Sequence, residues 1–87
     1  MLTRYAAAEY AKDGLRVNCI APGGHKTYPV GVPKEIIEEA GSRLVPYIPM
    51  GRLGLPQEVK GLAVYLASDA SGYVTGQTFT QDGGFTA

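Results

Sequence analysis

The residues best suited to chemistry follow a short apolar segment, Arg16–Ala21, and begin with the pair Pro22-Gly23. Gly23 has no Cβ, so the backbone there can approach a bound molecule closely. His25 adds an imidazole, a side chain that serves in catalysis and binding, and Thr27 adds a hydroxyl that can donate and accept a hydrogen bond. From the residues alone a simpler interpretation stays open: Pro-Gly ends a strand, and both side chains are solvated.

Composition argues against several other functions. Eight basic and eight acidic residues give a net charge of zero, whereas nucleic-acid binding requires clustered cations. Cys19 is the single cysteine, so neither an internal disulfide nor a thiolate metal cage is expected. No apolar stretch approaches the roughly 20 residues of a membrane span, and Arg4, Glu9, Lys12 and Asp13 argue against a signal-peptide core. The expected compartment is the cytoplasm.

Two elements are expected ahead of the candidate residues. Met1–Asp13 is rich in alanine and free of Gly and Pro, which predicts a helix, and Gly14 supplies a left-handed stop. Leu15–Ala21 has the apolar character of a strand. Pro22 cannot donate to a ladder, so the strand should end there.

Beyond the candidate residues the chain is punctuated by glycine and proline. Residues 23–33 hold three glycines and two prolines, which predicts a loop. A short helix is expected over Lys34–Ala40, with Pro33 at its first position. Residues 41–55 again have the composition of a loop.

The clearest helix is Pro56–Ser68, where Val59, Leu62, Ala63 and Leu66 form an apolar stripe of helical period. Gly61 costs roughly 1 kcal/mol relative to Ala in such a helix, which indicates close packing against another backbone.

A turn over residues 68–76 should lead into a last strand, Gln77–Gln81. Two strands joined through a helix should lie parallel. Parallel sheets extend further and are covered on both faces, so an α/β fold with more strands than this sequence contains is expected.

These elements carry a pattern that resembles the C-terminal part of a short-chain dehydrogenase/reductase. The resemblance implies the last two strands, with flanking helices, of a Rossmann-like doubly wound parallel sheet. It covers nearly the whole chain and is weakest between Tyr28 and Met50. It rests on the order and spacing of several short motifs: Ala7-Ala8-Glu9-Tyr10, Gly14-Leu15-Arg16-Val17-Asn18, Ala21-Pro22-Gly23, Gly51-Arg52-Leu53-Gly54 with Pro56, Glu58 and Val59, Tyr65-Leu66-Ala67-Ser68, Thr75-Gly76-Gln77 and Asp82-Gly83-Gly84.

The resemblance also implies cofactor-binding residues: Pro22, Gly23, His25 and Thr27 match the family's contacts to the nicotinamide side of NAD or NADP. At position 25 the family usually has Val or Ile, and the backbone amide, which any residue has, meets the carboxamide. Gln81 is a second departure, since an apolar residue usually stands there.

The family's catalytic groups find no match in this sequence. They are a Tyr, a Lys four residues later that favours the phenolate, and an upstream Ser. None of the six tyrosines has Lys four residues on, and no strand, Gly-rich turn and helix form a dinucleotide fingerprint. No catalytic residue is therefore assigned, and the isolated chain is expected to be inactive.

Within a complete domain, the resemblance implies an NAD(P)-dependent oxidoreductase of alcohols or carbonyls. Residues 28–50 would form a substrate lid, and the Pro56–Ser68 helix with the last strand would form a homo-oligomer surface. Two alternatives stay open. The chain is a non-catalytic truncated relative that binds full-length subunits, or it derives from a decayed gene or a misplaced start.

Overall fold

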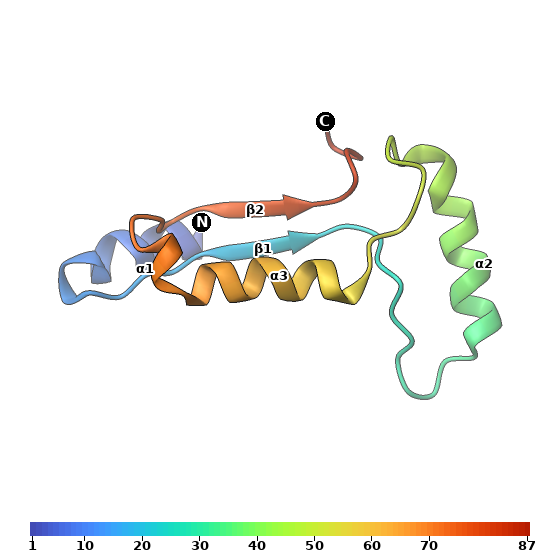
Figure 1. Cartoon of the computed structure of the whole chain (residues 1–87), viewed down its shortest axis with the longest axis horizontal. Helices are drawn as coiled ribbons and strands as arrows, with labels where there is room; N and C mark the ends of the chain where they lie inside the picture. Colours follow the sequence, from blue (N-terminus) through green and yellow to red (C-terminus); the bar gives the residue numbers. More distant parts are fainter.

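Helices and strands follow one another in the order that the sequence predicts (Figure 1). The computed structural model describes all 87 residues. Its elements are the α-helices α1 (Leu2–Tyr10), α2 (Lys34–Leu44) and α3 (Pro56–Ala67), the 3₁₀ turns η1 (Ala11–Asp13), η2 (Val45–Tyr47) and η3 (Asp69–Ser71), and the strands β1 (Cys19–Pro22) and β2 (Thr78–Gln81).

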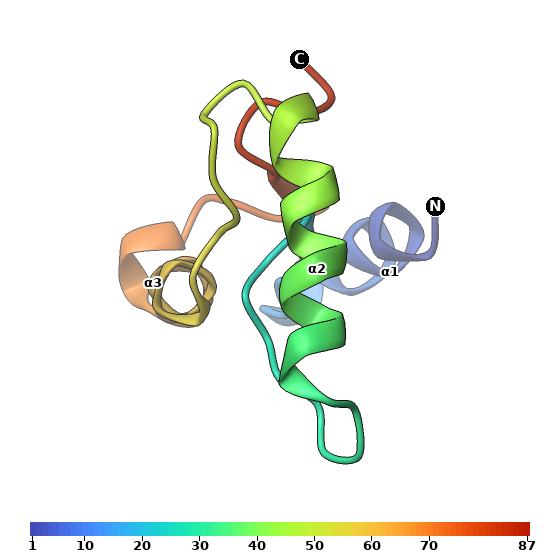
Figure 2. The same ribbon diagram turned by 90° about the vertical axis from the view of Figure 1, so that its right-hand side faces the viewer.

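The two strands pair in parallel, which confirms the prediction. Cys19 lies opposite Thr78, and Pro22 lies opposite Gln81. α1 and α3 lie on opposite sides of this strand pair, while α2 stands off beyond the carboxyl ends of the strands (Figures 1 and 2). None of the helices combines the length and the apolar character needed to cross a bilayer.

The first helix ends as its sequence predicts. The last turn tightens to η1, and Gly14 follows with a φ of 80°, in the left-handed region. Its N–H donates to the Ala11 carbonyl at 3.1 Å. A glycine adopts this conformation without the Cβ clash that penalises other residues, so it frees the chain to turn toward β1.

The strand predicted over Leu15–Ala21 is wrong at its start, because β1 begins only at Cys19. Ahead of it, the Gly76 N–H still donates to the Val17 carbonyl at 2.7 Å, but side chains replace the rest of the ladder. The Val17 N–H donates to Thr75 Oγ1 at 3.1 Å, and Asn18 Oδ1 accepts from the Gln77 N–H at 3.1 Å. β2 likewise starts one residue later than predicted, at Thr78. At its far end, Pro22 is the last residue of β1.

The helix predicted over Lys34–Ala40 is too short: α2 continues to Leu44, and part of the expected loop is helical. Pro33 is its N-cap and not its first residue. Gly41 is tolerated because a Cβ there would lie only 2.6 Å from Leu53 Cδ1, so tertiary packing overrides its low helix propensity.

Helix α3 matches its prediction to within one residue, and three members of the apolar stripe, Val59, Leu62 and Leu66, are its half-buried residues. The expectation for Gly61 is not met within this chain, because nothing lies within 4 Å of a Cβ placed there.

Little of the chain is buried. Only Ala7, Ile48 and Ser71 are fully buried, and the accessible surface is 6481 Å². A compact protein of this mass exposes about 4,900 Å². The radius of gyration is 15.8 Å, against roughly 12 Å for a compact chain of this length. The elements therefore form an open layer whose apolar faces are left uncovered.

Candidate functional site

The loop after β1 runs beside the segment that precedes α3. Gly54 forms a parallel bridge with His25: its N–H donates to the Gly24 carbonyl at 2.9 Å, and its carbonyl accepts from the Lys26 N–H at 2.8 Å. Because alternate backbone groups of an extended chain face opposite edges, the N–H and C=O of His25 face away from Gly54. Neither has a partner within the chain.

The structure brings all four residues of the predicted cofactor-contacting set together. Pro22, Gly23, His25 and Thr27 line one open pocket of about 570 Å³. The opposite wall is the first two turns of α3, which adds the cation of Lys60 to otherwise apolar surface. That wall consists of Pro56, Val59, Lys60 and Ala63.

The imidazole of His25 is held in place and is not simply solvated. Nδ1 lies 3.0 Å from the Gly23 carbonyl oxygen. A carbonyl can only accept, so in this contact Nδ1 carries the proton. The ring is half-buried and lies on Gly54, where an added Cβ would overlap it. The side chain thus packs against the anchor of its own loop.

Gly23 lies closely against the end of β2. Its N–H donates to the Gln81 carbonyl at 2.8 Å, and a Cβ there would lie 2.7 Å from Asp82 Cβ and 2.9 Å from Asp82 Cα. Glycine is required here by packing. Asp82 in turn accepts from the Thr86 hydroxyl at 2.6 Å, and this bond lowers the pKa of the Asp82 carboxyl.

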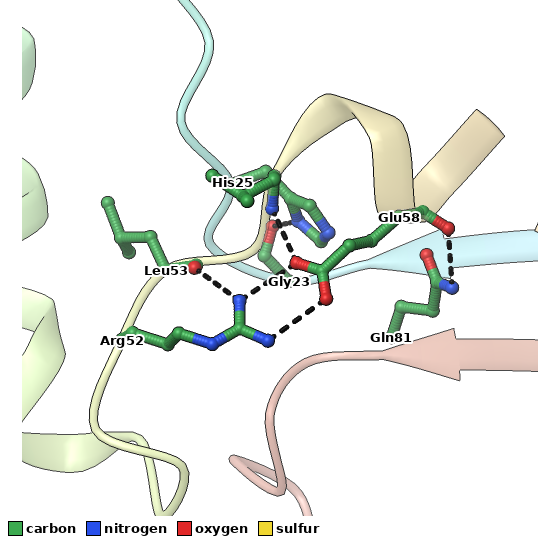
Figure 3. A network of polar contacts seen from close by, with 7 residues as sticks. Gly23, His25, Arg52, Leu53, Glu58 and Gln81 are labelled. Atoms are coloured by element: carbon green, nitrogen blue, oxygen red, sulfur yellow. Dashed lines mark hydrogen bonds and ion pairs between the residues drawn. The ribbon is translucent and has the colours of Figure 1, made fainter. Parts of the chain in front are cut away.

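An ion pair that sequence reasoning missed lies beside the loop (Figure 3). Arg52 and Glu58 form two hydrogen bonds, at 2.8 and 2.9 Å. Glu58 also accepts from the Leu55 N–H at 2.8 Å. The pKa of Glu58 is held at about 2, chiefly by the hydrogen bond from Arg52 and secondly by the one from the Leu55 N–H. The same ion pair raises the pKa of Arg52. In the sequence both residues stand out only as members of the family motif; the turn before Pro56 brings them together.

A smaller hollow of about 170 Å³ lies on the other side of His25 and includes Arg52, Glu58 and Asp82 in its wall. Gln81, the second departure from the family pattern, contributes to it. Its Nε2 donates to the Glu58 carbonyl at 3.1 Å, whereas its buried Oε1 has no hydrogen-bond partner. No three His, Cys, Asp or Glu residues come together as a metal-binding group.

These groups are suited to binding. The free N–H and C=O of His25 offer one donor and one acceptor side by side, which is the complement of a carboxamide. The Thr27 hydroxyl can do both, and Lys60 adds a positive charge at the same pocket.

A family model described as enoyl-(acyl carrier protein) reductase matches residues 1–86. Together with the α/β elements and the loop after β1, this match defines the class of protein. The chain belongs to the short-chain dehydrogenase/reductase family.

Two curated relatives illustrate the match. 3beta-hydroxysteroid dehydrogenase 1 of Eggerthella lenta is 48% identical over 86 residues, which is 99% of this chain and 33% of the relative. Acetoacetyl-CoA reductase of Rhizobium meliloti is 45% identical over 84 residues, which is 95% of this chain and 34% of the relative. The chain thus spans about a third of the length of the curated relatives that it matches.

Solved structures agree in fold. A short-chain dehydrogenase/reductase from Mycobacterium marinum is 42% identical with a TM-score of 0.86, and the match covers 99% of this chain and 32% of that one. A short-chain dehydrogenase from Leptospira borgpetersenii, solved with bound NAD+, is 37% identical with a TM-score of 0.82, covering 99% of this chain and 31% of the other.

Proposed function

We propose that the chain is the C-terminal part of an NAD(P)-dependent oxidoreductase domain, and that it supplies the nicotinamide-side loop, the substrate lid and an oligomer surface. The supporting observation is the pocket that gathers Pro22, Gly23, His25 and Thr27. A second support is the free edge of β1, since the sheet has only the order β1-β2.

The pocket residues fit a nicotinamide. The unpartnered N–H of His25 would donate to the carboxamide oxygen and its C=O would accept from the carboxamide nitrogen. Thr27 would add a hydrogen bond through its hydroxyl. Gly23 has no Cβ, so it would let the cofactor approach the backbone at the end of β1 closely. When bound, the cofactor supplies or accepts the hydride. These residues bind and orient it.

Substrate class and chemistry follow the same proposal. The substrate would be a small alcohol or carbonyl compound, enclosed by residues 28–50, of which α2 is the helical part. The proton-transferring Tyr and its Lys have no counterpart among these 87 residues. We therefore expect the isolated chain neither to bind NADH tightly nor to oxidise it, which absorbance at 340 nm would check.

The proposed oligomer surface is the outer side of α3 with β2. Val64 is 69% exposed on this helix, and Gly61 leaves open space for an approaching backbone. A second copy of the subunit would cover both. This part of the proposal predicts that Val64→Glu keeps a complete domain monomeric in light scattering.

A chimera tests the cofactor proposal. The chain replaces the matching segment of the Eggerthella lenta relative, and NADH binding is followed by fluorescence titration. We expect the chimera to bind NADH and Thr27→Val to weaken binding about tenfold, as loss of a hydrogen bond of roughly 1.4 kcal/mol requires. Thr80→Val, an exposed threonine of β2, is the control. Equal affinities for both variants would contradict the role of Thr27.

The free edge of β1 also suits the truncated-relative alternative, because an unpaired strand can pair with another chain. Co-purification with a full-length homologue would favour that alternative. An open reading frame upstream of Met1 that encodes a Gly-rich turn and Tyr-x-x-x-Lys would favour the C-terminal placement.

A further inference from the structure

The loop over residues 23–27 is tied to the rest of the molecule at two places. Gly23 donates to the Gln81 carbonyl, and Gly24 and Lys26 both bond to Gly54. Gly54 therefore sets the direction of the middle of the loop, including which way the N–H and C=O of His25 face.

Gly54 is itself held from both sides by one ion pair. On its N-terminal side, Arg52 Nη1 donates to the Leu53 carbonyl at 3.1 Å. On its C-terminal side, the Leu55 N–H donates to Glu58 Oε1 at 2.8 Å. Two hydrogen bonds join Arg52 to Glu58 (Figure 3). Because these two side chains also bond to Leu53 and Leu55, they close a frame around Gly54.

The geometry of this frame depends on the guanidinium. Its planar fork reaches both carboxylate oxygens and a carbonyl at once, whereas the ammonium of Lys has no fixed fork. The two side chains are 48% and 42% exposed, and exposed ion pairs contribute little to global stability. Loss of the pair should therefore loosen Gly54 without unfolding the sheet.

We propose that Arg52 and Glu58 are positioning residues: together they fix Gly54, and through Gly54 they fix the backbone of His25 toward the pocket. The inference concerns the loop itself. It rests on the proposed function only for the consequence that cofactor affinity follows loop order.

Amide hydrogen exchange of the 87-residue chain, followed by NMR, tests the positioning role. The reporters are the Gly54 and Lys26 amides, and the Cys19 amide, which donates to the Gln77 carbonyl at 2.9 Å, reports on the sheet. In Arg52→Met we expect exchange at both reporters to quicken about tenfold while Cys19 is unchanged, the signature of local opening. Arg52→Lys should restore part of the protection.

The matched control is Arg43→Met. Arg43 also forms an exposed ion pair, with Glu39 at 2.7 Å, but it lies on α2 and makes no hydrogen bond to the loop. This variant should leave the Gly54 and Lys26 amides unchanged.

Three results would overturn the inference. They are unchanged protection in Arg52→Met, loss of protection at Cys19 to the same degree, and an unprotected Gly54 amide in the parent chain. Failure of the proposed function would look different: the chimera would not bind NADH, while the exchange effect of Arg52→Met would remain. If both hold, Arg52→Met also weakens NADH binding by the chimera and Arg43→Met does not.

Discussion

The two ends of the strand pair are built in opposite ways. At the amino end of β1, side chains far apart in sequence bond to buried backbone. Arg16 Nη1 donates to the Ser71 carbonyl and to Ser71 Oγ, each at 2.8 Å, and Ser71 is completely buried. At the carboxyl end, the loop after Pro22 lies between two open pockets and leaves the His25 N–H and C=O without partners.

The difference separates an end where side chains anchor a helix from an end where backbone groups are free to take a partner. Arg16 joins the carbonyls of Ser68 and Ser71, where α3 ends, so a cation meets the negative end of the helix dipole. The other end of the sheet leaves its polar groups free. Ligands of open parallel sheets bind at the carboxyl ends of the strands. In this chain the His25 N–H and C=O, which have no hydrogen-bond partner, lie at that end.

Removal of the Arg16 guanidinium should cause the largest loss of stability, because it removes the anchor at the amino end of β1. Arg16→Met deletes three hydrogen bonds, one to Ser68 just after α3 and two to Ser71 in η3, and leaves the Ser71 carbonyl and hydroxyl buried without this donor. We expect a loss of about 3 kcal/mol in unfolding free energy, since hydrogen bonds from a charged donor contribute roughly 1.5–3 kcal/mol. Urea titration followed by circular dichroism measures it. Arg4→Met, an exposed arginine of α1, is the control, and an equal loss in both would contradict the anchoring role.

A pair of glycine substitutions should have a smaller effect and opposite signs. Gly23→Ala places a Cβ 2.7 Å from Asp82 Cβ, and overpacking of this kind costs about 1–3 kcal/mol. Gly61→Ala meets nothing within 4 Å on α3 and should stabilise by about 0.5–1 kcal/mol. Thermal unfolding of both variants checks the signs. A stabilising Gly23→Ala would show that the loop is free of β2.

Titration of Glu58 should give the smallest effect on stability. Its folded pKa of about 2 lies below the ordinary 4.5, so its contribution is complete above pH 4.5 and is lost as the pH falls toward 2. A carbon-13 NMR titration of the carboxyl should give a midpoint near 2 in the parent and one closer to 4.5 in Arg52→Met. Asp82, whose pKa is lowered chiefly by Thr86, should not respond to that substitution. A Glu58 midpoint unmoved by Arg52→Met would exclude the ion pair as its cause.

Much of the fold could be predicted from local signals. The helix stop at Gly14, the period of Val59, Leu62 and Leu66, and the parallel pairing of two strands joined through a helix all follow from residue types and spacing. The predicted element boundaries that were wrong depend on residues far away in the sequence. β1 starts late because side-chain bonds of Asn18 and Thr75 replace part of its ladder, and α2 continues through Gly41 because Leu53 fills the space.

The candidate site divides in the same way. Pro22, Gly23, His25 and Thr27 lie in one short segment whose motif resembles a known family, and the structure places them in one pocket; their contact with a cofactor stays a prediction. The sequence alone thus determined the order of the elements, the family pattern and the grouping of these four residues in one loop, since each depends on neighbours along the chain. Only the tertiary structure decided that His25 packs on Gly54 and that Arg52 and Glu58 hold Gly54 from both sides. Such contacts depend on how a loop meets a helix start, which hydrophobic periodicity does not encode.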